Sequence, residues 1–176
     1  VPAIAITLAA DAAMPSIFKI PGVMFALGMA IKAFTNVGDG VLIQQPVYMH
    51  FADAIVNNDR KVVSNDLIYE EDGRYHIDFE DFEKKIVENN IKLFLLCSPH
   101  NPVCRVWTRE ELSRLGEICL KHNVIVVSDE IHSDFVFEGT HTVFASISEE
   151  LANNSIIVTA PPKTFNLAGI QIAHNS

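Results

Sequence analysis

The sequence predicts a three-layer α/β/α fold with a mostly parallel sheet, and three observations lead to this prediction. Apolar runs of strand length alternate along the chain with segments of helical periodicity. Most of these runs are nearly continuous, as in strands that helices cover on both faces. Turn signals such as Gly38-Asp39-Gly40 and Asp72-Gly73 separate the segments. With 176 residues, the chain has the length of one domain.

Five apolar runs are the expected strands. They cover Val41–Gln45, Lys61–Ser64, Lys92–Cys97, Val124–Ser128 and Ser155–Thr159. In an open α/β sheet, ligands bind beyond the carboxyl ends of the strands. Four residues follow strands at that end, namely Tyr48, Asn101, Asp129 and Lys163. We therefore expect a site at this edge of the sheet.

Three segments between the strands are the expected helices. Val23–Phe34 is largely apolar, so we expect it to be buried. Asp78 is a good N-cap for a helix in which Phe82 and Ile86 recur at helical spacing, and Thr108-Arg-Glu-Glu111 is a capping box that begins another. We assign residues 1–16 to an N-terminal segment of uncertain structure and residues 17–176 to the domain.

The composition excludes several classes of function. The net charge of −9 argues against nucleic acid and against an anionic membrane surface as partners. Three cysteines, an odd number, favour a reducing cytoplasm over a disulfide framework. Apolar runs stay well short of the roughly 20 residues of a membrane span, and Val1–Ala10 lacks the positive leader of a secretory signal. We expect a soluble, cytoplasmic protein.

A strand-end acid and a strand-end lysine are the most informative pair. Asp129 ends one apolar strand, and Lys163 follows the next. Burial raises a carboxyl's pKa, so an ionised Asp129 would require a cationic partner, and a protonated pyridine is one. The apolar flanks of Lys163 predict partial burial, which makes a lysine nucleophilic. Together they fit a pyridoxal 5'-phosphate site, in which the lysine holds the aldehyde and the acid the ring nitrogen.

Five further residues complete this candidate site. Asn101 could donate to the phenolic oxygen of the cofactor, or it could simply open a turn. His132 could also contact that oxygen, or it could be a satisfied polar group. Tyr48 could stack on the ring or belong to the core. Gly22 and Val23 begin a helix whose free amides could bind the phosphate. A zinc site from Cys97, His100 and Cys104 is a weaker alternative, and we expect no metal.

These segments resemble the fold-type I pyridoxal phosphate enzymes of the class I/II aminotransferase superfamily. The likeness is greatest to the MalY/PatB-type cystathionine β-lyases, including the cystalysin-like carbon–sulfur lyases. The stretches that carry it are Pro21–Tyr48, Asp72–Ile86, Leu96–Leu112, Val124–Phe137 and Thr159–Gly169. Ser98-Pro-His-Asn-Pro102 and Ser128-Asp-Glu-Ile-His132 are specific to this lyase-like branch, because ordinary aminotransferases commonly carry a tyrosine at the position of His132.

The resemblance implies a role for each site residue. Lys163 corresponds to the Schiff-base lysine and Asp129 to the pyridinium partner. Asn101 and His132 correspond to the phenolic-oxygen contacts, Tyr48 to the stacking aromatic, and Gly22 and Val23 to the phosphate-binding turn. The implied activity is β-elimination from a thioether or thiol amino acid by a homodimer. Class I/II transamination, or a truncated non-catalytic remnant of the fold, are the alternatives.

The sequence also departs from the family pattern. Cys104 stands where the family usually has glycine, and Pro162 stands where it usually has serine before the lysine. Family members are much longer. We therefore expect a partial large domain of the pyridoxal phosphate-dependent transferase fold, without the small C-terminal domain.

Overall fold

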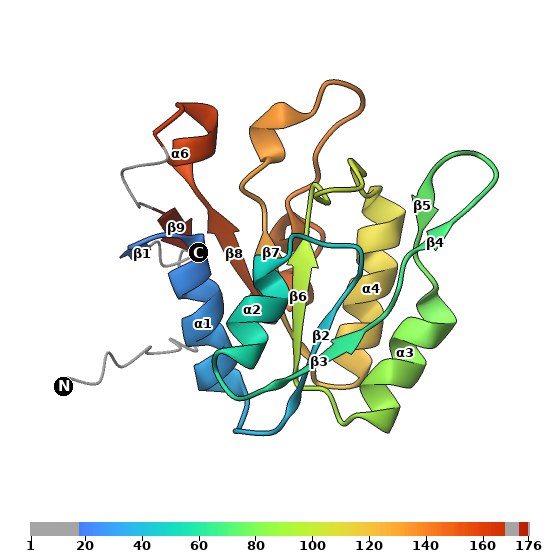
Figure 1. The fold of residues 1–176 in the computed structure, drawn as a ribbon. Helices are drawn as coiled ribbons and strands as arrows, with labels where there is room; N and C mark the ends of the chain where they lie inside the picture. Colours follow the sequence, from blue (N-terminus) through green and yellow to red (C-terminus); the bar gives the residue numbers. More distant parts are fainter. Residues whose placement is uncertain (1–17, 168–172, 176) are drawn as a thin grey trace.

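The computed structural model describes residues 18–167 and 173–175, and Figure 1 shows their arrangement. A seven-stranded sheet lies at the centre, in the order β1-β9-β8-β7-β6-β2-β3. Its strands are β1 (Phe18–Ile20), β2 (Gly40–Ile43), β3 (Lys61–Ser64), β6 (Leu93–Cys97), β7 (Ile125–Asp129), β8 (Ser155–Thr159) and β9 (Ala173–Asn175). A separate hairpin joins β4 (Ile68–Tyr69) to β5 (Tyr75–His76).

The sheet is mostly parallel, as predicted. Strands β8, β7, β6, β2 and β3 form a continuous parallel set, and antiparallel pairing adds β9 to β8 and β1 to β9. Two of the five expected strands, Lys61–Ser64 and Ser155–Thr159, have the predicted bounds. The other three differ by one or two residues at their ends. Gln44, for example, lies beyond β2, where its Nε2 donates to Asn65 Oδ1 at 3.0 Å.

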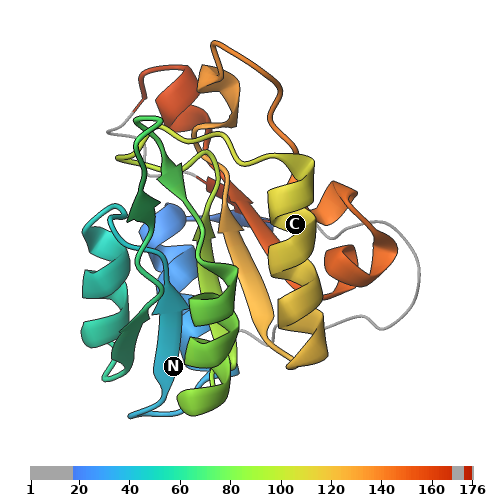
Figure 2. The ribbon, with the colours of Figure 1, turned by 90° about the vertical axis from the view of Figure 1, so that its right-hand side faces the viewer.

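Helices cover both faces of the sheet (Figures 1 and 2). The helices are α1 (Val23–Phe34), α2 (His50–Val56), α3 (Phe79–Glu88), α4 (Arg109–Lys121), α5 (Glu149–Asn153) and α6 (Pro161–Thr164), with 3₁₀ turns at Ser133–Phe135 and Phe144–Ser146. Alternate strand residues divide the core in two. Leu42, Phe94 and Val126 pack with α3 and α4, whereas Val41, Leu93 and Val127 pack with α1 and α2. The predicted three layers are confirmed.

The predicted helix starts are correct. Thr108 and Glu111 form the capping box of α4 in both directions, and the Asp78 side chain accepts a hydrogen bond from the Asp81 amide at the start of α3. α1 has the predicted bounds, but its burial is restricted to one face. Leu27, Ala30 and Ile31 are buried, whereas Met24 and Phe25 are exposed, because only one side of α1 meets the sheet.

Several elements were not predicted, namely β1, β9, α2, α5, α6 and the β4–β5 hairpin. The helix α2, with seven residues, and the two-residue strands of the β4–β5 hairpin are too short to show a clear period. The boundary between the N-terminal segment of residues 1–16 and the domain falls outside the described residues. Within the described residues, no helix is both long and apolar enough to cross a bilayer.

Candidate functional site

Asp129 and Lys163 come from neighbouring parallel strands. Asp129 is the last residue of β7 and pairs with Val158 of β8, and Lys163 lies on α6 directly beyond β8 (Figure 1). Asp129 is 5% exposed. The positive charge of Lys163 adds to the lowering of the pKa of His132 and partly opposes the rise in the pKa of Asp129. The amine is therefore within electrostatic range of both side chains. The fold therefore brings the predicted acid and lysine together.

The environment of Asp129 is suited to a cation. The pKa of this carboxyl is raised to about 7, chiefly by burial and to a smaller extent by the neighbouring charge of Glu130. The Ile131 amide, which donates to Oδ1 at 3.3 Å, and the charge of Lys163 act in the opposite direction. Because the effect of burial on this pKa is the largest, a cationic group placed against the carboxyl would stabilise its ionised form. A protonated ring nitrogen is such a group, so this residue fits the predicted cofactor.

Lys163 is exposed, and the prediction of partial burial from its apolar flanks is wrong. α6 extends past the end of β8 and so carries the lysine beyond the core. Phe165 and Leu167, which follow it, are also exposed. Apolar neighbours in the sequence therefore did not predict the burial of this lysine correctly, since burial depends on which surfaces pack together.

His132 follows Asp129 by three residues and lies within electrostatic range of Lys163. Its side chain is partly buried, and burial first and the charge of Lys163 second lower its pKa. A neutral imidazole can donate one hydrogen bond to an oxygen. This is compatible with the predicted contact to a phenolic oxygen.

Tyr48 and Asn101 lie on two loops at the same edge of the sheet, after β2 and β6. Tyr48 is 39% exposed, with its ring edge-on to His50, so the alternative that it is a core residue is wrong. The backbone amide of Asn101 donates to Cys97 Sγ at 3.4 Å, and the Asn101 side chain is partly buried. His100 joins the two loops by donating from Nε2 to the Pro46 carbonyl at 3.0 Å.

The Gly22–Val23 turn has the backbone that a phosphate site requires. Gly22 is the N-cap of α1 with φ +93°, a conformation that favours glycine, and no atom lies within 4 Å of an added Cβ. The amides of the first turn of α1 have no intrahelical acceptor, and that turn carries no acidic residue. α1 runs toward the start of β2, so its N-terminus lies at the same edge as the strand ends (Figure 1).

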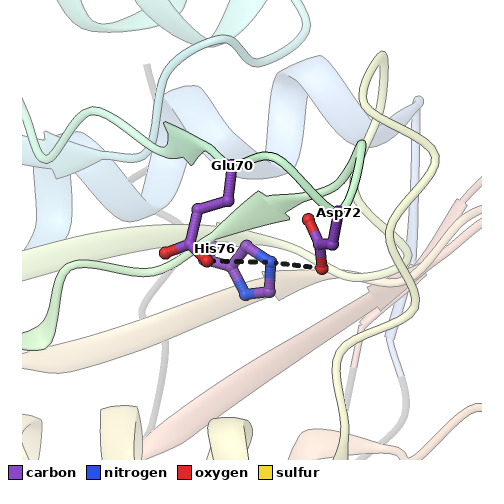
Figure 3. Close-up of side chains that lie close together, drawn as sticks. All are labelled: Glu70, Asp72 and His76. Atoms are coloured by element: carbon purple, nitrogen blue, oxygen red, sulfur yellow. Dashed lines mark hydrogen bonds and ion pairs between the residues drawn. The ribbon is translucent and has the colours of Figure 1, made fainter.

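The weaker zinc alternative is not supported among the described residues. Cys97 Sγ accepts from the Asn101 amide and lies 3.4 Å from the Pro99 carbonyl, while Cys104 is exposed. A group of potential metal ligands that the described residues do bring together lies elsewhere, on the β4–β5 hairpin, and consists of Glu70, Asp72 and His76 (Figure 3). Glu70 and Asp72 are exposed and His76 is partly buried, and the 2.9 Å hydrogen bond between His76 Nε2 and Asp72 Oδ2 accounts for their arrangement.

Sequence reasoning missed one contact at the site. Thr164 Oγ1, next to Lys163, donates to Asp134 Oδ2 at 2.5 Å. This bond ties α6 to the 3₁₀ turn that follows His132. The 30-residue separation of the two partners left no local pattern from which the bond could be predicted.

Cys104 adopts a backbone conformation that suits the glycine of the family pattern. Its φ is +57°, in the left-handed region that costs a residue with a Cβ about 1 kcal/mol. We expect Cys104→Gly to raise the free energy of unfolding by about 0.5–1 kcal/mol, after allowance for the extra entropy of glycine in the unfolded chain. Urea denaturation measures this. Cys104→Ala is the control, since it removes the thiol and keeps the Cβ; equal stability of the two variants would contradict the prediction.

A mostly parallel sheet with helices on both faces, in which one strand ends in an acid and the next is followed by a lysine, is the arrangement of the large domain of the pyridoxal phosphate-dependent transferase fold. The chain belongs to the family of class I and II aminotransferases, whose sequence profile matches residues 12–174.

Three relatives illustrate the range of this family. Cystathionine beta-lyase PatB of Bacillus subtilis (strain 168) is 52% identical over 157 residues, which is 89% of this chain and 40% of that protein. Aspartate aminotransferase of Sulfolobus acidocaldarius is 33% identical, over 88% of this chain and 38% of that protein. The crystal structure of cystalysin from Treponema denticola, which contains pyridoxal 5'-phosphate, superposes with a TM-score of 0.87 at 46% identity, covering 90% of this chain and 41% of that one. The chain thus spans about two fifths of the length of these relatives.

Proposed function

We propose that this chain is the cofactor-binding part of a pyridoxal 5'-phosphate-dependent carbon–sulfur β-lyase. The observation that carries the proposal is the buried Asp129 carboxyl, whose pKa is raised to about 7, within electrostatic range of Lys163. The similarity to cystathionine beta-lyase PatB and to cystalysin supports the choice of reaction.

Each site residue has a proposed role in holding the cofactor. Asp129 would pair with the ring nitrogen, and Lys163 would hold the aldehyde carbon. Asn101 and His132 would contact the phenolic oxygen, and Tyr48 would cover the ring face. The amides that follow Gly22, from Val23 onward, would bind the phosphate. The bound cofactor would supply a ring that accepts the electrons left at the substrate's Cα.

The chain's own part in the reaction is proton transfer and electrostatic stabilisation. Lys163, when its amine is free, would take the Cα proton. The Cβ–sulfur bond would then break, and the thiolate would leave and be protonated. Water would convert the remaining three-carbon fragment of a cysteine-type substrate to pyruvate and ammonia. Asp129 would stay ionised against the ring nitrogen throughout, because a cation beside it favours the charged carboxylate.

Transamination is the second candidate, because an aspartate aminotransferase is also among the relatives. The two reactions share Lys163 and Asp129 and differ in what leaves the substrate. L-Cystathionine would yield a free thiol in a lyase, whereas an aminotransferase would pass the amino group to an added 2-keto acid. A non-catalytic remnant of the fold would do neither.

We also propose a homodimer in a reducing compartment such as the cytoplasm. Apolar side chains next to the site residues Val23 and Tyr48 are exposed, namely Met24, Phe25 and Met49, which is typical of surfaces that another chain covers. All three cysteines are free, as expected where thiols stay reduced.

The proposal predicts that the purified protein binds pyridoxal 5'-phosphate covalently and reversibly. Mixing the two should give a yellow solution, and borohydride should fix the cofactor to Lys163, which peptide mass spectrometry locates. Pyridoxine 5'-phosphate, which lacks the aldehyde, is the control and should leave no adduct. Adducts spread evenly over exposed lysines such as Lys92 would contradict the proposal.

A further inference from the structure

Glu130, the residue after Asp129, is a buried carboxyl group outside the candidate site. Its side chain is 1% exposed and accepts three hydrogen bonds, each of 2.9 Å, from Ser128 Oγ, the Phe144 amide and His141 Nε2. Three donors on one buried carboxylate hold it in one orientation. Nothing in the proposed chemistry requires this group.

The bond between Glu130 and His141 closes a loop. Residues 131–140 lie between the two partners, and this loop carries His132 of the candidate site. Asp134, in the same loop, accepts the hydrogen bond from Thr164, next to Lys163. Both views of the ribbon place the turn of residues 133–135 beside α6 (Figures 1 and 2). The loop is therefore held at its base by Glu130 and His141, and at its turn by α6.

Within the part of the chain that the structure describes, little buried surface holds this loop. Most of its residues are exposed, namely Asp134, Phe135 and the four residues 137–140. Segments with little buried apolar surface open easily unless specific bonds hold them. Glu130 itself lies away from the cofactor position, because neighbouring residues at a strand end point to opposite faces and its bonds reach Phe144 in the core on the α3–α4 side.

We propose that Glu130 and His141 form a clasp that positions His132 directly and Lys163 through the Asp134–Thr164 bond. The inference rests on the proposed function, since it assigns to the clasp the task of setting the geometry of the cofactor-binding residues. Glu130 and His141 are positioning residues, and neither touches the cofactor.

The first test needs no cofactor. Hydrogen–deuterium exchange of residues 131–140 is compared in the parent protein, His141→Leu and Glu138→Leu. Glu138 is exposed in the same loop, so its variant changes the same segment without touching the clasp. We expect exchange in the loop to accelerate about tenfold or more in His141→Leu, because the buried Glu130 loses a charge-assisted partner. Unchanged exchange in a folded His141→Leu protein would overturn the clasp.

The second test measures pyridoxal 5'-phosphate itself. We expect the dissociation constant of the cofactor to rise about tenfold in His141→Leu and Glu130→Leu, the size of effect that supporting residues have on bound groups. The absorbance band of the lysine-bound cofactor should shift as well. Glu138→Leu should match the parent. Glu130→Gln should recover most of the affinity, because its amide oxygen still accepts from the Ser128 hydroxyl and the Phe144 amide while its amide nitrogen donates to His141 Nε2 in the other tautomer.

The outcomes separate the two proposals. If the parent binds the cofactor at Lys163 and His141→Leu binds it equally well with an unshifted band, the clasp is overturned and the proposed function stands. If the parent itself forms no adduct, the proposed function fails, and the positioning role fails with it. Should Glu130→Leu not fold, His141→Leu and Glu130→Gln still decide the question.

Discussion

Replacing Lys163 with alanine is expected to abolish lyase turnover, by at least about 10³-fold, because no other amine would then take the Cα proton or hold the aldehyde. Borohydride should no longer fix pyridoxal 5'-phosphate to the protein. Weak, reversible cofactor binding should remain, since Asp129 and the first turn of α1 are intact. The measurements are thiol release from L-cystathionine and mass spectrometry of the reduced protein.

The fold should survive this change. Lys163 is exposed, and its loss removes no buried contact, so the free energy of unfolding should stay within about 0.5 kcal/mol of the parent's. Lys92→Ala is the matched control, because Lys92 is an exposed lysine at the opposite end of the parallel strands. Undiminished thiol release by Lys163→Ala, or equal loss in Lys92→Ala, would remove Lys163 from its proposed role.

Asp129→Asn is expected to have two opposite effects, on stability and on activity. The folded-state pKa of Asp129 is about 7, above the ordinary value of 3.8. The folded protein therefore holds the proton more tightly than the unfolded chain does, and stability falls as pH rises from about 4 to about 7. Above pH 7 the buried charge costs roughly 3–5 kcal/mol, which a neutral asparagine avoids.

We therefore expect cofactor-free Asp129→Asn to be more stable than the parent at pH 8, and equal to it at pH 4. Urea titrations at the two pH values measure the difference. Glu138→Gln is the control, since it removes an exposed charge in the adjoining loop and should reproduce the parent's pH dependence. An unchanged pH dependence in Asp129→Asn would show that this carboxyl is not the buried acid described.

The same substitution should lower lyase turnover by at least about 10²-fold, because an amide cannot supply the charge that keeps the ring nitrogen protonated. Increased stability with lost activity is the usual pattern where a site stores an unfavourable charge for function. An Asp129→Asn protein that is both destabilised at pH 8 and fully active would contradict both expectations.

The sequence by itself determined the architecture and the order of the site residues. Nearly continuous apolar runs of strand length, separated by turn signals and by segments of helical period, are typical of parallel strands covered on both faces, so the sequence predicted the parallel core. Capping at Asp78 and Thr108 depends on residues three positions apart, which local pattern reveals. Because parallel strands end at one edge, Asn101, Asp129 and Lys163 could be placed together before their contacts were known.

Only the tertiary structure decided how each of these residues is exposed and what it contacts. Asp129 is buried because β7 lies between β6 and β8, whereas Lys163 is exposed because α6 extends past the core. The bonds from His141 to Glu130 and from Thr164 to Asp134 join residues that are 11 and 30 positions apart. Local periodicity carries no information about such pairs, since their separation is set by how strands and loops pack in space. The chain's pattern therefore specifies which groups reach the sheet edge, and packing sets their charge, exposure and orientation.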